Sequence, residues 1–306
     1  MQDMMQKVVA EVGRALMGKE KPVKLSVATL LAGGHLLIED LPGLGKTTLA
    51  HALAHVVGLE YKRVQFTSDM LPADLTGFSM LDKSSGEFKF MPGPIFSQVL
   101  LADEINRASP KTQSALLEGM EERQVSMDGV TRPLPSPFFV IATQNPHSLA
   151  GTFPLPESQM DRFLMRIRLG YPDVATERKI LQGEHKRDEI EQVKACLSQE
   201  QLLQAQTMVQ HTKVSDAALD YVQRLLVATR EGADFVHGIS PRGGLALMRA
   251  AKAWALLSGR SYLTPDDIQA VVPAVFSHRL ASRKTGTQCS IAEIDQWVQG
   301  IEILAA

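Results

Sequence analysis

The sequence is poor in cysteine and in long apolar runs, and each shortage narrows the class of protein. Its two cysteines, Cys196 and Cys289, stand far apart and form no Cys-x-x-Cys pair, which suits free thiols in a reducing compartment. No apolar run approaches the roughly 20 residues that cross a bilayer. The first residues also lack the basic and apolar regions of a secretory signal. We therefore expect a cytoplasmic protein without a membrane span.

Net charge is also nearly absent. Lysine and arginine number 32 against 34 acidic residues, a formal net charge of -2, so the overall charge does not require nucleic acid or an acidic membrane as a partner. The chain has 306 residues, of which 44% are hydrophobic and 22% charged. This is an ordinary globular composition with room for two domains.

One stretch has the pattern of a phosphate-binding loop. His35–Glu39 is typical of a buried strand, residues 48–57 have a helical pattern, and Asp40-Leu41-Pro42-Gly43-Leu44-Gly45-Lys46-Thr47 lies between them. In such loops the backbone N–H groups surround a polyphosphate, the lysine binds the outer phosphates and the next hydroxyl binds Mg²⁺. We predict a nucleotide site with Thr47 as a metal ligand, formed by Pro42, Gly43, Leu44, Gly45, Lys46, Thr47 and Thr48.

Two carboxylates follow another expected strand, Ser97–Ala102. Alone, Asp103 and Glu104 could cap a solvated helix, but the upstream Lys46-Thr47 pair makes them the second half of a nucleotide-hydrolysis site. We predict that Asp103 holds Mg²⁺ through water and that Glu104 orients and activates the attacking water.

A third apolar strand is expected at residues 138–143, and Gln144-Asn145-Pro146 follows it. A polar residue beside the acidic strand can reach the same water, so we assign Asn145 to the hydrolytic site. An asparagine that caps a turn before proline is the alternative.

Two hairpins are expected near these strands. Residues 77–94 turn at 83–86 and interrupt a helix that we expect to begin near residues 68–69, while residues 124–134 turn at Asp128-Gly129. The first hairpin is either a solvated excursion or a loop that touches something in a central pore.

From residue 173 onward the pattern is helical. We expect helices at 173–187, 199–211, 215–230, 241–258, 265–272 and 290–303. Arg242 lies in the first turn of its helix, where the macrodipole disfavours a cation. An anionic nucleotide nearby would explain it, and so would a surface carboxylate. We expect an α/β domain over residues 1–171 and an all-helical domain over residues 172–306.

Six stretches together resemble the AAA+ ATPases of the MoxR family, and the resemblance covers essentially the whole chain. They are residues 41–47, 93–96, 101–108, 113–118, 142–146 and 240–242. The resemblance implies a three-layer P-loop NTPase core with a parallel sheet and inserted hairpins, followed by a helical lid. It also implies hydrolysis of ATP with Mg²⁺ in a homo-oligomeric ring, commonly a hexamer, with sites at subunit boundaries.

The resemblance gives roles to particular residues. Asn145 resembles the sensor on the fourth core strand, and Arg162 resembles the arginine finger that reaches a neighbour's nucleotide. Arg242 resembles the second sensor on the lid, in its own subunit or a neighbour's. Arg107 is a further candidate for the neighbouring site. Asp40 stands where the family frequently has glycine, so we expect this sequence to differ from the family only in the fine geometry of the loop.

The resemblance further implies chaperone-like remodelling of a protein client, often with von Willebrand factor A domain proteins, in maturation or metal insertion of target complexes. One alternative is a nucleic-acid-dependent motor. It is favoured by four basic residues on or near the inserted hairpins: Lys83, Lys89, Arg123 and Arg132. The net charge and the lack of an appended DNA-binding module oppose it. A non-hydrolysing scaffold is the weaker alternative, because the acid, base and sensor positions are all filled.

Overall fold

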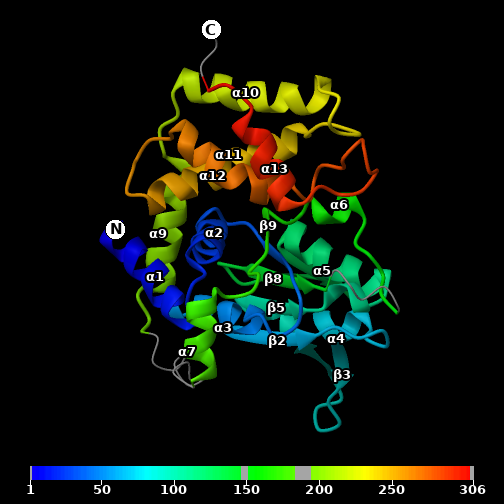
Figure 1. The fold of residues 1–306 in the computed structure, drawn as a ribbon. Coiled ribbons are helices and arrows are strands. Elements are labelled where there is room, and N and C mark those ends of the chain that lie inside the picture. Colours follow the sequence, from blue (N-terminus) through cyan, green and yellow to red (C-terminus); the bar gives the residue numbers. More distant parts are fainter. Residues whose placement is uncertain (1, 146–150, 183–193, 304–306) are drawn as a thin grey trace.

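A five-stranded parallel sheet forms the centre of the computed structural model, which describes residues 2–145, 151–182 and 194–303 (Figure 1). The strand order is β2-β5-β8-β1-β9 and all neighbouring pairs run parallel. The strands are β1 (Leu36–Glu39), β2 (Tyr61–Gln65), β5 (Val99–Asp103), β8 (Phe139–Gln144) and β9 (Met165–Ile167). Because parallel strands end at the same edge, the segments after β1, β5 and β8 meet there.

Helices cover both faces of this sheet and make three layers. Leu36 and Ile38 of β1 pack in one apolar cluster with residues of α1 (Gln2–Ala15), α2 (Glu20–Leu31) and α3 (Lys46–Val56). Leu37 points to the opposite face and packs in a second cluster with α4 (Pro72–Thr76) and α5 (Pro110–Glu122). Successive residues of a strand point to opposite faces, so one short apolar strand contributes to both cores.

Most of the helical part stands above the sheet in Figure 1, whereas its first helix, α7, is drawn at the lower left. Its central helix α11 contacts α2 of the α/β part, and one apolar cluster runs through both parts. The helices are α7 (Val174–Leu181), α9 (Gln199–Gln210), α10 (Asp216–Glu231), α11 (Pro241–Leu257), α12 (Pro265–Phe276) and α13 (Ile291–Gln299). The expected fold class, an α/β core with a parallel sheet followed by an all-α lid, is confirmed. A division between residues 171 and 172 stays a prediction.

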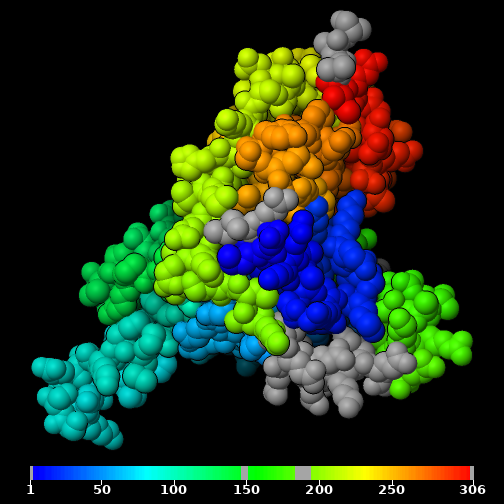
Figure 2. All heavy atoms as spheres, turned by 90° about the vertical axis from the view of Figure 1, so that its left-hand side faces the viewer, coloured from blue at the N-terminus to red at the C-terminus, as the bar shows by residue number. Residues whose placement is uncertain are grey.

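Both expected hairpins are present, one formed by β3 (Gly77–Leu81) and β4 (Phe88–Pro92), the other by β6 (Gln124–Met127) and β7 (Val130–Pro133). Figure 2 shows the β3–β4 hairpin, in cyan, projecting from the body of the molecule. The two hairpins contact each other, since the Arg132 guanidinium lies 3.9 Å from the Phe90 ring centroid and Ser79 Oγ donates to Asp128 Oδ2 at 2.7 Å.

Several boundaries differ from those expected. The helix after the phosphate loop begins at Lys46, two residues early, and α4 begins only at Pro72, after Leu71 in place of Ser68 or Asp69. Helix α12 continues through Pro273 to Phe276, because its last turns are buried and packing outweighs the missing N–H. Of the helical segment expected at residues 157–163, the structure forms only the short helix α6 (Glu157–Met160). Residues 183–187 of an expected helix lie outside the described residues.

Within the described ranges, no helix is long and apolar enough to span a bilayer.

Candidate nucleotide site

The phosphate loop joins β1 to α3 at the carboxyl edge of the sheet. Gly45 has a left-handed backbone, with φ of +91°, and the helix begins at the next residue. The N–H groups of the first helical turn have no helical acceptor and are available to an anion. They belong to Lys46, Thr47 and Thr48, with Pro42, Gly43 and Leu44 in the loop before them. The loop therefore has the geometry of an anion site.

Lys46 lies in the same loop and is buried. Its Nζ donates to the backbone carbonyls of Asp40, at 2.5 Å, and Leu41, at 3.2 Å. Burial lowers the pKa of Lys46, while the charges of Asp103, Asp40 and Glu104 raise it. The lysine and the two predicted catalytic acids are thus close enough to interact electrostatically, so the structure brings together the two halves of the predicted site.

The acidic pair is held by β8. Asp103 is the last residue of β5, and Glu104 follows with a positive φ of 55°. The Thr143 hydroxyl donates to Asp103 Oδ1 at 2.6 Å and accepts from the Glu104 backbone N–H at 2.8 Å. Thr143 therefore fixes the direction of both acids. Sequence reasoning missed this threonine, although it immediately precedes the Gln144-Asn145 pair.

Strand β2 supplies a polar partner to each acid. Arg63 Nη2 donates to Asp103 Oδ2 at 2.6 Å, and Gln65 Nε2 donates to Glu104 Oε2 at 3.0 Å. Arg107 Nη1 also contacts Glu104 Oε2, at 2.9 Å. Arg63 and Gln65 were missed as well; their signal is the two-residue spacing that puts both on one face of a strand. Arg107 lies beside its own chain's acid, and its predicted role at a neighbouring site stays a prediction.

Asn145 directly follows β8, between the strands that carry the loop and the acids. It is half-buried and engaged in an interaction within the protein. This position at the shared edge is the one that the sequence predicts, and its action on water stays a prediction.

Asp40, the departure from the usual loop pattern, accepts three hydrogen bonds from backbone N–H groups. Its Oδ2 accepts from Leu169 and Gly170, both at 2.7 Å, and its Oδ1 accepts from Leu41 at 2.9 Å. The carboxylate therefore ties the start of the loop to the segment after β9. A glycine at this position could not make these bonds.

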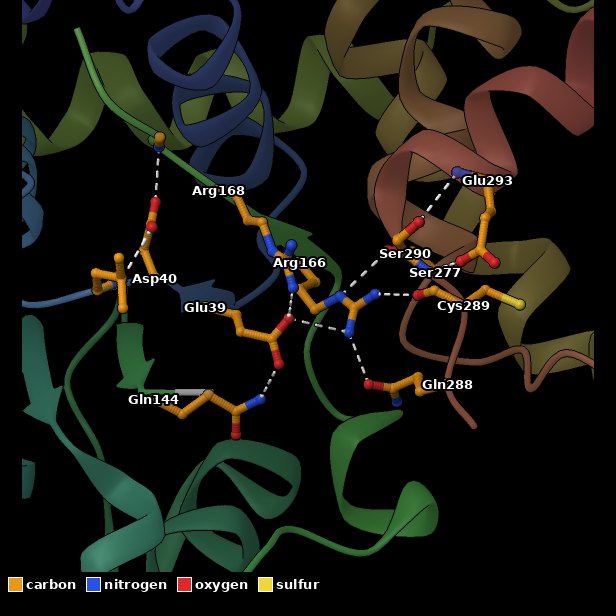
Figure 3. A network of polar contacts seen from close by, with 12 residues as sticks. Glu39, Asp40, Gln144, Arg166, Arg168, Ser277, Gln288, Cys289, Ser290 and Glu293 are labelled. Atoms are coloured by element: carbon orange, nitrogen blue, oxygen red, sulfur yellow. Dashed lines mark hydrogen bonds and ion pairs between the residues drawn. The ribbon is translucent and has the colours of Figure 1, made fainter. Parts of the chain in front are cut away.

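A buried ionic network lies next to Asp40 (Figure 3). Glu39 accepts from Gln144 at 3.0 Å, from Arg168 at 2.9 Å and from Arg166 at 3.3 Å. Arg166 is 3% exposed and also donates to lid acceptors: Ser277 Oγ, Gln288 Oε1 and the Cys289 carbonyl. One arginine thus connects the strand before the phosphate loop with the lid.

Arg162 and Arg242 lie at the opposite edge of the sheet. They line a cavity of about 200 Å³ together with His35, which precedes β1, and Leu164, which precedes β9. The four residues of β1 separate this cavity from the phosphate loop by about 13 Å at 3.3 Å per residue. The structure therefore does not bring Arg162 or Arg242 to the chain's own Lys46 and Glu104.

Both arginines have partners in the cavity. Glu121 Oε2 lies 3.4 Å from Arg162 Nη1 and 2.5 Å from Arg242 Nη2, and Asp161 lies 3.6 Å from Arg242 Nε. Arg162 Nη1 also donates to the Leu117 carbonyl at 2.8 Å. The carboxylate partner considered for Arg242 is thus present.

A second cavity, of about 520 Å³, adjoins the phosphate loop. Its walls come from Leu16, Met17 and Gly18, which follow α1, and from Thr176 and Lys179 of α7. Leu16 reaches the loop, since a β-carbon built on Gly45 would lie 3.5 Å from Leu16 Cδ2. This part-apolar cavity was not predicted from the sequence, because it joins segments about 160 residues apart.

A parallel sheet with a phosphate loop after its first strand, followed by a helical lid, defines an AAA+ ATPase. Residues 35–165 match the family of ATPases associated with various cellular activities, and residues 227–295 match the AAA lid domain. The chain belongs to the MoxR family of these ATPases, as its relatives show.

Three proteins illustrate the likeness. The uncharacterized protein YeaC of Bacillus subtilis is 47% identical over 274 residues, covering 90% of this chain and 86% of that protein. Chaperone MoxR1 of Mycobacterium tuberculosis is 41% identical, covering 90% and 75%. A crystal structure from Cytophaga hutchinsonii superposes with a TM-score of 0.88 at 35% identity, covering 98% of this chain and 94% of that one.

Proposed function

We propose that this ATPase hydrolyses ATP at a site completed by two copies of the chain and uses the reaction to remodel a protein partner. The observation that supports the proposal is that the predicted site residues lie at two opposite edges of the sheet. Lys46, Asp103 and Glu104 meet at one edge of the sheet, while Arg162 and Arg242 lie at the other. A head-to-tail contact between copies would bring the two edges together, and such contacts form a ring when the rotation between copies closes.

The first half of the site binds the nucleotide and activates water. The N–H groups of the loop and the Lys46 ammonium bind the phosphates, and Glu104 accepts a proton from the attacking water. Asn145 orients that water from the adjacent strand. Arg63 and Gln65 hold the two carboxylates until the site is filled, because each donates to one of them.

The donor set fits Mg²⁺, which prefers hard oxygen ligands and keeps several of its waters. Thr47, in the first turn of α3, would supply a hydroxyl, and Asp103, the last residue of β5, would supply a carboxylate. When bound, the ion neutralises charge on the phosphates. Asp103 Oδ2 would then be shared between the ion's ligand shell and Arg63, which contacts this oxygen at 2.6 Å.

The second half of the site supplies positive charge. Charge that develops on the transferred phosphoryl group is stabilised by a positioned arginine, an effect worth about 10³ to 10⁵ in rate. Arg162 and Arg242 would supply it to the neighbour's nucleotide, which assigns Arg242 in trans. Release from Glu121 accompanies this step, because that carboxylate contacts both side chains.

The 520 Å³ cavity beside the loop is the place for the base of the nucleotide. Its apolar residues Leu16, Met17 and Val23 offer a surface on which a flat ring can pack. Its other wall belongs to α7, so base binding would link the phosphate loop with the start of the helical part.

For the partner we rely on relatives. One is named a chaperone, and we propose a chaperone-like role in a hexameric ring for this chain. We further propose cooperation with von Willebrand factor A domain proteins in maturation or metal insertion of target complexes. The nucleic-acid motor is not favoured. Arg123 donates to the Gly33 carbonyl, and Arg132 lies over Phe90 and donates to its own hairpin, so two of the four basic residues are already committed.

Mixing two inactive variants tests the proposal. Lys46→Ala loses its own nucleotide but retains the arginines, while Arg162→Ala retains nucleotide binding and loses turnover. In a ring assembled at random from equal amounts, about a quarter of the boundaries join an intact loop to an intact Arg162, so turnover should recover to roughly that fraction. Assembled mixtures without recovery, or an Arg162→Ala protein with parental turnover, would disprove the shared site.

A further inference from the structure

The cavity that contains Arg162 and Arg242 carries an excess of positive charge. Five arginines and two carboxylates line it, which leaves three formal positive charges: Arg123, Arg162, Arg242, Arg249 and Arg279 against Glu121 and Asp161. His35 adds no charge at neutral pH, because burial and Arg123 lower its pKa to about 3. A cavity of this charge attracts an anion.

Four of the five arginines have acceptors inside the protein. The Arg279 side chain is 6% exposed and donates to Asp161 at 2.6 Å, and Arg123 donates to the Gly33 carbonyl at 2.9 Å. Arg162 and Arg242 share Glu121. Arg249 differs: among residues 2–145, 151–182 and 194–303, none forms a hydrogen bond or ion pair with its side chain.

The charges that act most strongly on Arg249 are of its own sign. Burial lowers the pKa of Arg249, and the positive charges of Arg123 and Arg242 lower it further. A guanidinium that faces two others and has no acceptor among the described residues is available to an anion. The alternative, a surface arginine whose charge water satisfies, predicts no effect of its removal on an anionic ligand.

The helix places Arg249 beside the predicted second sensor. Arg242 and Arg249 are seven residues apart on α11, two turns along one face, and Ala246 between them also lines the cavity. The small alanine leaves room between the two side chains. Arg249 is exposed, so its free donors can reach a group presented by another copy.

We propose that Arg249 is a third arginine that contacts the phosphate chain of a neighbouring copy's nucleotide, beside Arg162 and Arg242. The inference rests on the proposed function, because the ligand comes from another chain. A guanidinium can donate two parallel hydrogen bonds to phosphate oxygens. A lysine at this position would provide the charge but not this paired geometry.

The test compares Arg249→Ala and Arg249→Lys with Lys252→Ala. Lys252 lies on the same helix, but its Nζ donates to the Gln210 carbonyl and it does not line the cavity. In assembled protein we expect Arg249→Ala to weaken ATP binding about tenfold to a hundredfold, the usual worth of one charge-assisted contact. Arg249→Lys should recover part of this loss. Binding to dilute, unassembled chains should stay parental in all three variants, since the arginine acts across a boundary.

Three results would overturn the inference. Parental ATP affinity of assembled Arg249→Ala would show that the side chain touches no nucleotide. An equal loss in unassembled chains, or the same loss in Lys252→Ala, would show a role within the fold. If Arg249→Ala did not fold, the affinity of Arg249→Lys would decide between these outcomes.

The mixture of Lys46→Ala and Arg162→Ala separates this inference from the proposed function. Recovery there together with a parental Arg249→Ala would refute only the third arginine. Failure to recover would refute the shared site, and the role of Arg249 would fall with it.

Discussion

Replacing Asp40 by glycine, the usual residue at this loop position, should damage the protein. The carboxylate accepts hydrogen bonds from the N–H groups of Leu41, Leu169 and Gly170 at 2.9, 2.7 and 2.7 Å. Asp40 and Leu169 are both buried, so water cannot fully replace the lost acceptor. The loop would gain a flexible residue and lose its attachment to the segment after β9.

The expected loss follows from these bonds. A hydrogen bond to a charged group contributes about 1.5 to 3 kcal/mol, and water recovers part of the two that are only half-buried. We therefore expect Asp40→Gly to lower the free energy of unfolding by about 3 to 5 kcal/mol. For a chain of this length that is a fall of about 5 to 8 °C in the unfolding midpoint. The KM for ATP should rise as well, because Asp40 begins the phosphate loop.

Denaturant and thermal unfolding of Asp40→Gly, Asp40→Ala and Asp40→Asn measure this effect. Asparagine retains one acceptor oxygen and should lose less than alanine, while glycine should lose most because it adds backbone freedom. An Asp40→Gly protein within about 0.5 kcal/mol of the parent would show that the three bonds contribute little.

Three further predictions follow from the same structure. Glu104→Gln should bind ATP with parental affinity but turn it over at least about a hundredfold more slowly, because an amide cannot accept the proton; parental single-turnover rates would place the base elsewhere. Glu39→Ala should lower the free energy of unfolding in denaturant by about 3 to 5 kcal/mol, because it leaves buried Arg166 without a carboxylate. Arg168→Ala removes an exposed side chain and should lower it by under about 1 kcal/mol. Equal losses in the two variants would contradict the role of the buried Glu39–Arg166 pair. Between pH 7.5 and 5.5, His35 should remove about 1.4 kcal/mol of stability, because the unfolded chain takes up the proton near pH 6.5 and the folded chain only near pH 3. His35→Gln should reduce that slope in pH-dependent unfolding, and an unchanged slope would refute the assignment.

The sequence predicts the fold class and the position of the phosphate loop because both rest on local patterns. Apolar runs followed by Gly45-Lys46-Thr47 or by Asp103-Glu104 indicate strands, with the predicted site residues directly after them. The hairpin that turns at Asp128-Gly129 is equally local, because its turn sequence fixes the pairing. These features needed no knowledge of the strand order.

Other features depend on which segments become neighbours. Arg63 meets Asp103 only because β2 lies beside β5, and Asp40 meets Leu169 only because β9 lies beside β1. The distance of Arg242 from the chain's own phosphate loop depends on how α11 packs on α2. No local pattern in one sequence contains these pairings, so the sequence left open whether Arg242 acts in its own subunit or in a neighbour's.

The central claim is that one chain alone has only half of a hydrolytic site. ATP turnover per chain, measured across a range of chain concentrations beside sedimentation of the same samples, tests it most directly. Turnover should be almost absent where the chain sediments as a monomer and should rise steeply as copies associate. Full turnover by monomers would contradict the claim, since no neighbour would then supply Arg162.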